Sequence, residues 1–165
     1  MFENIYSNAK WKTIDINYPS IDLILKKIPT SPGIYTISTN AATEILSGFK
    51  EREDPMHYNL SKKVKASSYL PSWLRIMQHD DFPYVVYSGH SYRLRQRAKE
   101  HFKGSKGTGC LAVFNLENLR NYDWSFRYLE TSFMLEDYKE DTILFRTVLE
   151  QRLRVEMGWP LLCSQ

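Results

Sequence analysis

Alternating apolar and polar side chains predict three β-strands, at residues 34–38, 83–89 and 123–129. A period of two is typical of a strand that buries one of its faces. The first strand follows a Ser-Pro-Gly turn, and the second ends at a glycine, where the chain can turn. We therefore expect a small sheet of three strands in mixed orientation, flanked by helices.

The spacing of apolar residues and the end signals predict helices at 91–103 and 135–157, each followed by a glycine that ends it. A shorter helix is predicted at 21–27, where a serine precedes the first turn. It lies within residues 1–30, which we interpret as an N-terminal extension.

Residues 40–81 are the least regular part of the chain. We interpret them as an insertion with one or two short helices, the later one at 72–79. The order strand, insertion, strand, helix, strand, helix predicts a single α/β or α+β domain over residues 1–165.

Composition narrows the class of protein. The chain of 165 residues is 42% hydrophobic, which suffices for a packed core. No apolar run is long enough to predict a membrane span, and the first residues show no secretory pattern. Two cysteines, Cys110 and Cys163, are too few for a disulfide framework or a closed zinc site. We therefore expect a cytoplasmic protein with no membrane partner.

The net charge is +3, and the basic residues concentrate in one segment. Residues 90–106 hold six Lys or Arg and one acid, whereas residues 130–141 hold five acids and one Lys. A compact basic segment suits a phosphate-bearing partner. The alternative is a solvated helix face that binds nothing.

The helix predicted at 91–103 presents two stripes, because residues four apart share a face. The apolar stripe is Leu94, Ala98 and Phe102, and the polar stripe is Arg93, Arg97 and His101. The polar stripe then lies at the edge of the core, where a guanidinium can clamp phosphate oxygens. The alternative is an arginine that only covers the core edge.

Glu150 lies on an apolar face of the last predicted helix, with Ile143 and Met157 seven positions away on either side. A carboxylate in such a place needs a partner. A divalent cation is one candidate. A salt bridge with Arg146 or Arg154, each four residues away, is the alternative.

Taken together, these residues resemble the GIY-YIG nuclease family. Gly33-Ile34-Tyr35 matches the first family signature, and Tyr87-Ser88-Gly89 matches the second with Ser in place of Ile. Further family positions follow without a gap, at Ser91, Leu94, Arg97 and His101. Glu150, on the last helix and ahead of a proline, matches the family's metal-binding glutamate. The resemblance covers residues 33–38 and 82–163.

Three features depart from the family pattern. Tyr35 and Tyr87 lie 52 positions apart, and the insertion accounts for this long spacing. Ser88 replaces an apolar strand residue. Cys163 stands where the family often has an asparagine, three residues after the proline.

The resemblance implies hydrolysis of a DNA phosphodiester bond with one divalent metal ion, Mg²⁺. Glu150 would bind the metal, and Arg97 would stabilise charge on the phosphate. Tyr35 would act as the general base, with a pKa lowered by Arg97 or His101. Tyr87 would orient the water or the phosphate, and His101 would hold Tyr35 or relay its proton.

DNA is the expected partner, and its expected contacts are His90, Arg93, Lys62, Lys63 and Lys65. We expect Tyr69 and Trp73 to pack beneath the lysines of the insertion. The long spacing between the signatures favours a restriction-type or defence-type endonuclease, and cleavage of both strands would favour a homodimer. The alternatives are a structure-specific or repair nuclease, and a nucleic-acid-binding module of the same fold without catalysis.

Overall fold

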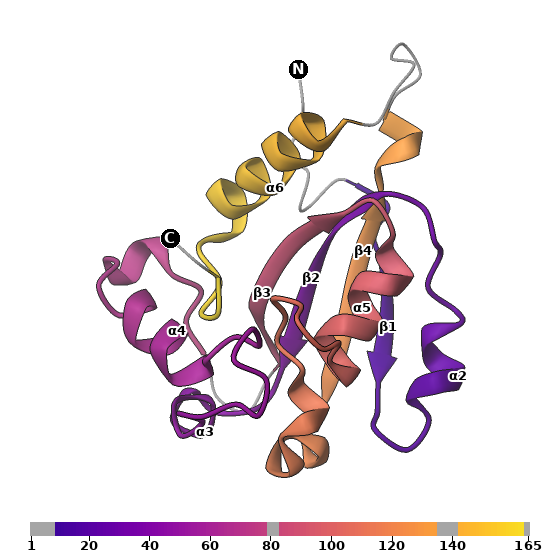
Figure 1. Ribbon diagram of the computed structural model, residues 1–165. Helices are drawn as coiled ribbons and strands as arrows, with labels where there is room; N and C mark the ends of the chain where they lie inside the picture. The colour runs from indigo at the N-terminus through magenta and orange to yellow at the C-terminus, as the bar shows by residue number, and fades with distance from the viewer. Residues whose placement is uncertain (1–8, 79–82, 135–141, 164–165) are drawn as a thin grey trace.

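The computed structural model describes residues 9–78, 83–134 and 142–163 (Figure 1). Its centre is an antiparallel sheet with the strand order β1-β4-β2-β3. The strands are β1 (Lys12–Ile16), β2 (Gly33–Thr39), β3 (Tyr84–Ser91) and β4 (Trp124–Glu130). The α+β class is confirmed. The prediction of three strands in mixed orientation is wrong, because the described residues form four strands and all their pairings are antiparallel.

β1 is the strand that the hydrophobic pattern missed, and it lies within the expected N-terminal extension. Lys12 and Thr13 are exposed, and only Ile16 is buried. Such a strand carries little alternation in its sequence. It pairs with β4, where Ile14 lies opposite Phe126, and forms one edge of the sheet.

The α-helices of the described residues are α2 (Ile21–Leu25), α3 (Thr43–Ser47), α4 (Leu60–Ser67), α5 (Leu94–Lys103) and α6 (Ile143–Met157). Short 3₁₀ turns lie at Ser72–Leu74, Val113–Asn115, Glu117–Asn121 and Thr131–Met134. No helix of the described part of the chain is long and apolar enough to cross a membrane.

The helix boundaries differ from the expected ones for local reasons. α5 begins at Leu94 because Ser91 still belongs to β3 and Arg93 has an extended backbone. α6 begins after Thr142, whose hydroxyl accepts a hydrogen bond from the backbone N–H of Phe145 at 3.1 Å. Residues 135–141 of the expected last helix lie outside the described residues.

The insertion contains two short α-helices, α3 and α4, as expected. The later helix, expected at 72–79, is instead a single 3₁₀ turn. It ends because the backbone of Arg75 is extended and pairs in parallel with Trp159. Residue 79 lies outside the described residues.

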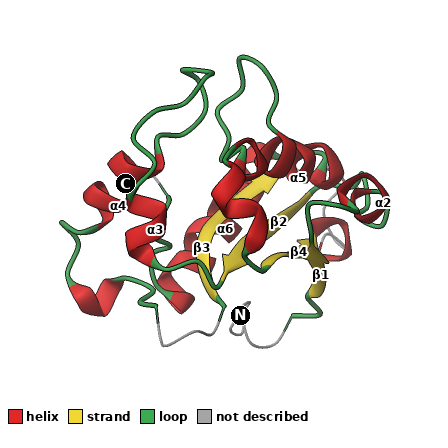
Figure 2. Cartoon of the chain, turned by 90° about the horizontal axis from the view of Figure 1, so that it is seen from below, coloured by secondary structure: helices red, strands yellow, loops and turns green. Residues whose placement is uncertain are grey.

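The sheet separates two layers of side chains. Tyr35 and Phe126 stack with ring centroids 5.0 Å apart, on the face covered by α5 and its Phe102. Ile34 and Leu129 pair across β2 and β4 and pack against α6. α5 and α6 therefore cover opposite faces, and the edge strand β3 contacts both helices. Figure 2 shows α5 against the sheet with α2 beside it.

The C-terminal segment ties the insertion to the edge of the sheet (Figure 1). The backbone N–H of Trp159 donates to the carbonyl of Leu74 at 2.7 Å, and that of Ile76 donates to the carbonyl of Trp159 at 3.0 Å. The N–H of Leu162 donates to the carbonyl of Val86 on β3 at 2.8 Å. The insertion, the end of α6 and β3 are thus held together although they lie far apart in sequence.

Gly33 begins β2 at a place that has no room for a side chain. An added Cβ would lie 2.4 Å from the carbonyl oxygen of Leu129 and 2.8 Å from Cδ1 of Leu94. Those atoms belong to β4 and α5. Glycine at this position therefore lets the strand and the helix approach β2 closely.

We expect Gly33→Ala to lower the free energy of unfolding by about 1–3 kcal/mol, because β4 or α5 must move to admit the methyl group. Gly48→Ala is the control. Gly48 has an ordinary helical φ of −70°, and its added Cβ would meet its nearest atom at 3.3 Å. Its expected change is below about 1 kcal/mol. Equal losses in urea unfolding of the two variants would contradict the packing argument.

Candidate active site

The hydroxyl of Tyr35 is the centre of a buried polar cluster between β2 and α5. Its oxygen lies 2.8 Å from Nε2 of His101, and the Nε–H of Arg97 donates to it at 3.2 Å. Tyr35 and His101 are almost completely buried. The structure therefore brings three of the predicted site residues into direct contact.

The hydrogen bonds fix which nitrogen of His101 carries the proton. The backbone N–H of Leu111 donates to Nδ1 at 3.3 Å, so Nδ1 acts as an acceptor. Burial, together with the nearby Arg97, holds the pKa of His101 well below its ordinary value, and the ring is neutral. In that tautomer Nε2–H is the donor, and it points at the oxygen of Tyr35.

The loop that contacts His101 is itself held by the insertion. Arg52 donates from Nη2 to the carbonyl of Leu111 at 2.7 Å and to that of Ala112 at 3.0 Å. The insertion therefore supports the position of His101 from a residue that the sequence analysis did not single out. Arg52 lies in an irregular segment, which has no periodic pattern to indicate such a role.

The prediction of a lowered pKa for Tyr35 is wrong. Burial raises the pKa of Tyr35 well above its ordinary value and outweighs the opposite effect of Arg97. His101 is neutral and supplies no positive charge. In the resting protein Tyr35 is therefore a phenol, whose oxygen accepts two hydrogen bonds.

Gly89 is required by the position of Tyr35. The two residues lie opposite each other in the register of β2 and β3. An added Cβ at Gly89 would lie 2.4 Å from the Tyr35 hydroxyl oxygen. The glycine of the second sequence signature thus makes room for the tyrosine of the first.

Arg97 has its guanidinium at the rim of this cluster, with 19% of its side chain exposed. Besides Tyr35, it contacts Glu100, to which Nη1 donates at 2.9 Å. Among the described residues, Nη2 of Arg97 has no hydrogen-bond partner. This nitrogen of the guanidinium is therefore available to an anionic group such as a phosphate.

Two further tyrosines extend the cluster. Tyr87 stacks on Tyr35 with ring centroids 6.3 Å apart and lies 4.7 Å from the His101 ring. Burial raises its pKa, with Tyr35 adding to the effect. Tyr58, from the insertion, lies 6.1 Å from Tyr87, and the ammonium of Lys63 lies over the Tyr58 ring at 4.7 Å. Tyr58 was not among the site residues predicted from the sequence.

The other predicted DNA contacts lie at the surface. Lys62, Lys65 and Arg93 are exposed, as a phosphate contact requires. The expectation that Tyr69 and Trp73 pack beneath the lysines is wrong. Their side chains are 75% and 79% exposed, because the chain leaves α4 and forms the 3₁₀ turn instead of a helix that would cover them.

Glu150 and His90 form a second group at β3, on the α6 side of the sheet. The Glu150 carboxylate is buried and forms an ion pair with Arg154. Its Oε2 lies 3.7 Å from Nε2 of His90. We expected apolar, buried neighbours for Glu150 along α6. Leu153 is buried as expected, but Ile143 is 68% exposed.

Arg154 links this second group to the middle of β3. It donates from Nε to the hydroxyl of Ser88 at 2.9 Å and from Nη2 to the carbonyl of Ser88 at 3.3 Å. The backbone N–H of Ser88 donates to Sγ of Cys163 at 3.2 Å. The two residues that depart from the family pattern, Ser88 and Cys163, are therefore direct neighbours.

The two groups interact electrostatically across β3. Burial raises the pKa of Glu150, while Arg154 and Arg97 act in the opposite direction. The carboxylate in turn contributes to the raised pKa of Tyr35. A negatively charged ligand at this edge would meet Arg97 from one group and Arg154 from the other.

The donor set for a metal ion is small. The described residues contain no group of three or more His, Cys, Asp or Glu side chains that could hold a metal. Glu150 offers one hard oxygen, Oε2, while Arg154 contacts Oε1. One carboxylate fits Mg²⁺ only in the mode in which waters and a substrate phosphate complete the coordination.

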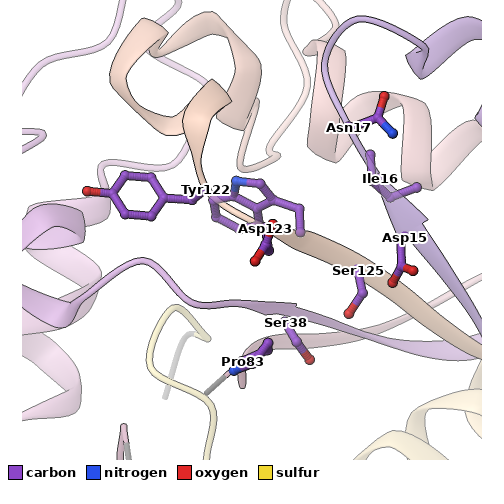
Figure 3. A pocket seen from close by; sticks show the side chains of 9 residues that line it. Asp15, Ile16, Asn17, Ser38, Pro83, Tyr122, Asp123 and Ser125 are labelled. Carbon is purple, nitrogen blue, oxygen red and sulfur yellow. The ribbon is translucent and has the colours of Figure 1, made fainter. Parts of the chain in front are cut away.

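A separate pocket at the opposite end of the sheet contains none of the predicted site residues (Figure 3). Its lining includes Asp15, Asp123 and Ser125. The carboxylate of Asp123 accepts a hydrogen bond from the amide of Asn40 at 2.9 Å. Nothing in this pocket indicates a ligand.

Comparisons with protein-family models, with curated proteins and with solved structures found no match to this chain. The function of the protein must therefore be inferred from its own residues and their geometry.

The buried neutral His101 predicts a pH dependence of stability. The ordinary pKa of a histidine is about 6.5. At a pH below this value, His101 binds a proton in the unfolded chain but not in the folded protein. Stability should therefore fall with decreasing pH, by up to about 1.4 kcal/mol per pH unit from this residue. His101→Gln keeps an N–H donor but does not titrate, so its urea-unfolding free energy should fall less between pH 6.5 and pH 5. Identical pH slopes for the two proteins would contradict a neutral His101.

Proposed function

We propose that this protein is a divalent-metal-dependent DNA endonuclease of the GIY-YIG type. The observation that carries the proposal is the Tyr35 oxygen, which accepts hydrogen bonds from both His101 and Arg97. Two donors, one of them cationic, stabilise a phenolate more than a phenol. This arrangement suits a tyrosine that takes up a proton during a reaction.

In the proposed reaction, a water molecule attacks the phosphorus of a DNA phosphodiester, and the bond to the 3′ oxygen breaks. Tyr35 first releases its phenolic proton to solvent, and as the phenolate it then accepts the proton of the attacking water. His101 holds the phenolate oxygen through Nε2–H. Arg97 stabilises the charge that develops on the phosphate oxygens through its free nitrogen. Tyr87, packed against Tyr35 and His101, orients the water or the phosphate.

Glu150 is the residue that would bind the metal ion, through Oε2. When bound there, Mg²⁺ would stabilise the leaving 3′ oxygen as a Lewis acid. Arg154 and Ser88 fix the orientation of the Glu150 carboxylate, and they are the supporting residues that such a single-carboxylate site needs.

The DNA would lie against the exposed basic residues around the cluster. Lys62 and Lys65 of α4 and Arg93 at the start of α5 are exposed, and His90 lies beside Glu150. Lys63 contacts the cluster through Tyr58. Within this class we favour a restriction-type or defence-type enzyme that cuts both strands as a homodimer, with repair or structure-specific cleavage as the alternative.

One observation favours a second candidate function. The ion pair between Glu150 and Arg154 provides the carboxylate with a partner inside the chain, as the salt-bridge alternative in the sequence analysis expected. A protein in which this pair is purely structural would bind DNA through the same basic residues without cleaving it.

Loss of the Tyr35 hydroxyl tests the proposed base. Tyr35→Phe should lower the single-turnover rate of Mg²⁺-dependent DNA cleavage by about 10²- to 10⁴-fold, the range for a lost general base. The matched control is Tyr84→Phe. It also removes a buried tyrosine hydroxyl, which donates to the carbonyl of Ala41 at 3.0 Å, away from the cluster. Equal rates in the two variants would contradict the role of Tyr35.

Glu150→Gln separates the two candidate functions. If Glu150 binds the metal, the variant should lose Mg²⁺-dependent cleavage but bind DNA as tightly as the wild type or more tightly, because a negative charge is removed. Glu130→Gln is the control, since it alters a carboxylate of similar exposure that is paired with Lys12. A wild type that cleaves no DNA, together with a Glu150→Gln variant destabilised by about 3–5 kcal/mol, would support the DNA-binding module instead.

A further inference from the structure

A pocket of about 550 Å³ lies between the insertion and the C-terminal end of α6. The insertion contributes Trp73 and Arg75, α6 contributes Gln151 and Arg154, and Trp159 follows α6. Figure 1 shows these segments side by side, at the end of α6 that lies nearest the insertion. None of the residues placed in the catalytic cluster around Tyr35 lines it.

The walls of this pocket are fixed by the backbone. Arg75 and Trp159 are partners in a parallel bridge, flanked by the hydrogen bonds described above. Gly158 has a φ of +94°, and an added Cβ would lie 3.3 Å from the side chain of Ile76. The glycine therefore allows the close approach that places Trp159 against the insertion.

The pocket combines the exposed surface of an aromatic side chain with hydrogen-bond donors that are enclosed in its walls. Trp73 is 79% exposed, the exposure of an aromatic residue that nothing in the described chain covers. Nε1 of Trp159 and Nε of Arg75 are buried, and neither has a hydrogen-bond partner among the described residues. A buried donor without a partner is unfavourable unless a ligand or water provides an acceptor.

Arg154 connects the pocket to the proposed cleavage site. Its guanidinium lies over the Trp159 ring at 4.7 Å, and the same side chain contacts Ser88 and Glu150. A ligand group in the pocket would therefore lie one arginine side chain away from the carboxylate at the cleavage site.

We propose that this pocket binds one nucleobase of the DNA substrate, an inference that rests on the proposed function. A nucleobase offers a planar face for Trp73. Its edge offers acceptor atoms, which Nε1 of Trp159 and Nε of Arg75 would reach once these side chains turn from the wall into the pocket. A phosphate would use the arginines but not the tryptophans, and an apolar side chain of a protein would leave the donors without partners. A base in the pocket and a phosphate at Arg97 would fix the position of the cut relative to that base.

The test compares oligonucleotides with and without bases, in the absence of Mg²⁺. The probes are a fluorescein-labelled thymidine oligonucleotide of about ten nucleotides and an abasic sugar-phosphate chain of the same length and charge. The wild type should bind the base-bearing chain at least about fivefold more tightly, as expected for one stacked base. Trp73→Ala should bring this ratio close to one. Tyr69→Ala, which changes an equally exposed aromatic residue outside the pocket, should leave the ratio unchanged.

A second pair of probes identifies the source of the base. A duplex with one unpaired thymidine should show the same Trp73-dependent gain over a fully paired duplex if the pocket takes bases that are already unpaired. A Trp73-dependent affinity for the fully paired duplex would indicate a base displaced from the stack. Either result supports a base-binding pocket.

The outcomes separate this inference from the proposed function. The proposed base-binding role of the pocket would be overturned if the wild type bound both oligonucleotides equally, or if Trp73→Ala left the affinity ratio unchanged. This holds even if the protein cleaves plasmid DNA with Mg²⁺. A Trp73-dependent ratio in a protein that cleaves no DNA would support the pocket and point to the DNA-binding module. Failure to bind either oligonucleotide would overturn the pocket.

Discussion

The site depends on one constraint, the burial of a tyrosine hydroxyl that accepts two hydrogen bonds. Burial alone raises the pKa of Tyr35 and disfavours the phenolate. Arg97 and His101 act against this by donating to the same oxygen, and His101 can donate only because Leu111 sets its tautomer. The balance leaves a phenol in the resting protein whose surroundings are already arranged for the charged form.

Much of the surrounding structure follows from this arrangement. Gly89 must lack a side chain because the Tyr35 hydroxyl occupies that space. The antiparallel register of β2 and β3 brings these two positions together, and α5 supplies the two donors from successive turns. The insertion takes part as well, because Arg52 holds the loop that contacts His101, and Tyr58 packs on Tyr87. A chain segment that looks like an interruption in the sequence therefore supports the site.

The sequence predicted the elements with strong periodicity and the residues on them. The family resemblance implied that Tyr35, Arg97 and His101 act together, and the structure places the three side chains in direct contact. β1 was missed because an exposed edge strand carries little alternation of apolar and polar residues. Irregular segments have no such period, and for this reason the sequence held no signal for Arg52 or Tyr58. The burial of Trp73 was predicted wrongly for the same reason. The prediction of a lowered pKa for Tyr35 was wrong because the burial of a side chain depends on the tertiary structure. The choice of Arg154 as the partner of Glu150 depends on Ser88, which lies far away in sequence.

The central claim is that Tyr35 takes a proton from water and does not itself attack the phosphorus. A single-turnover cleavage in water enriched in ¹⁸O, with Mg²⁺, tests it most directly. The account predicts one ¹⁸O atom in the phosphate at the 5′ end of the DNA product and no covalent link between protein and DNA in samples quenched at any time during the turnover. DNA joined to a tyrosine of the protein, or a terminal phosphate without the label, would contradict it.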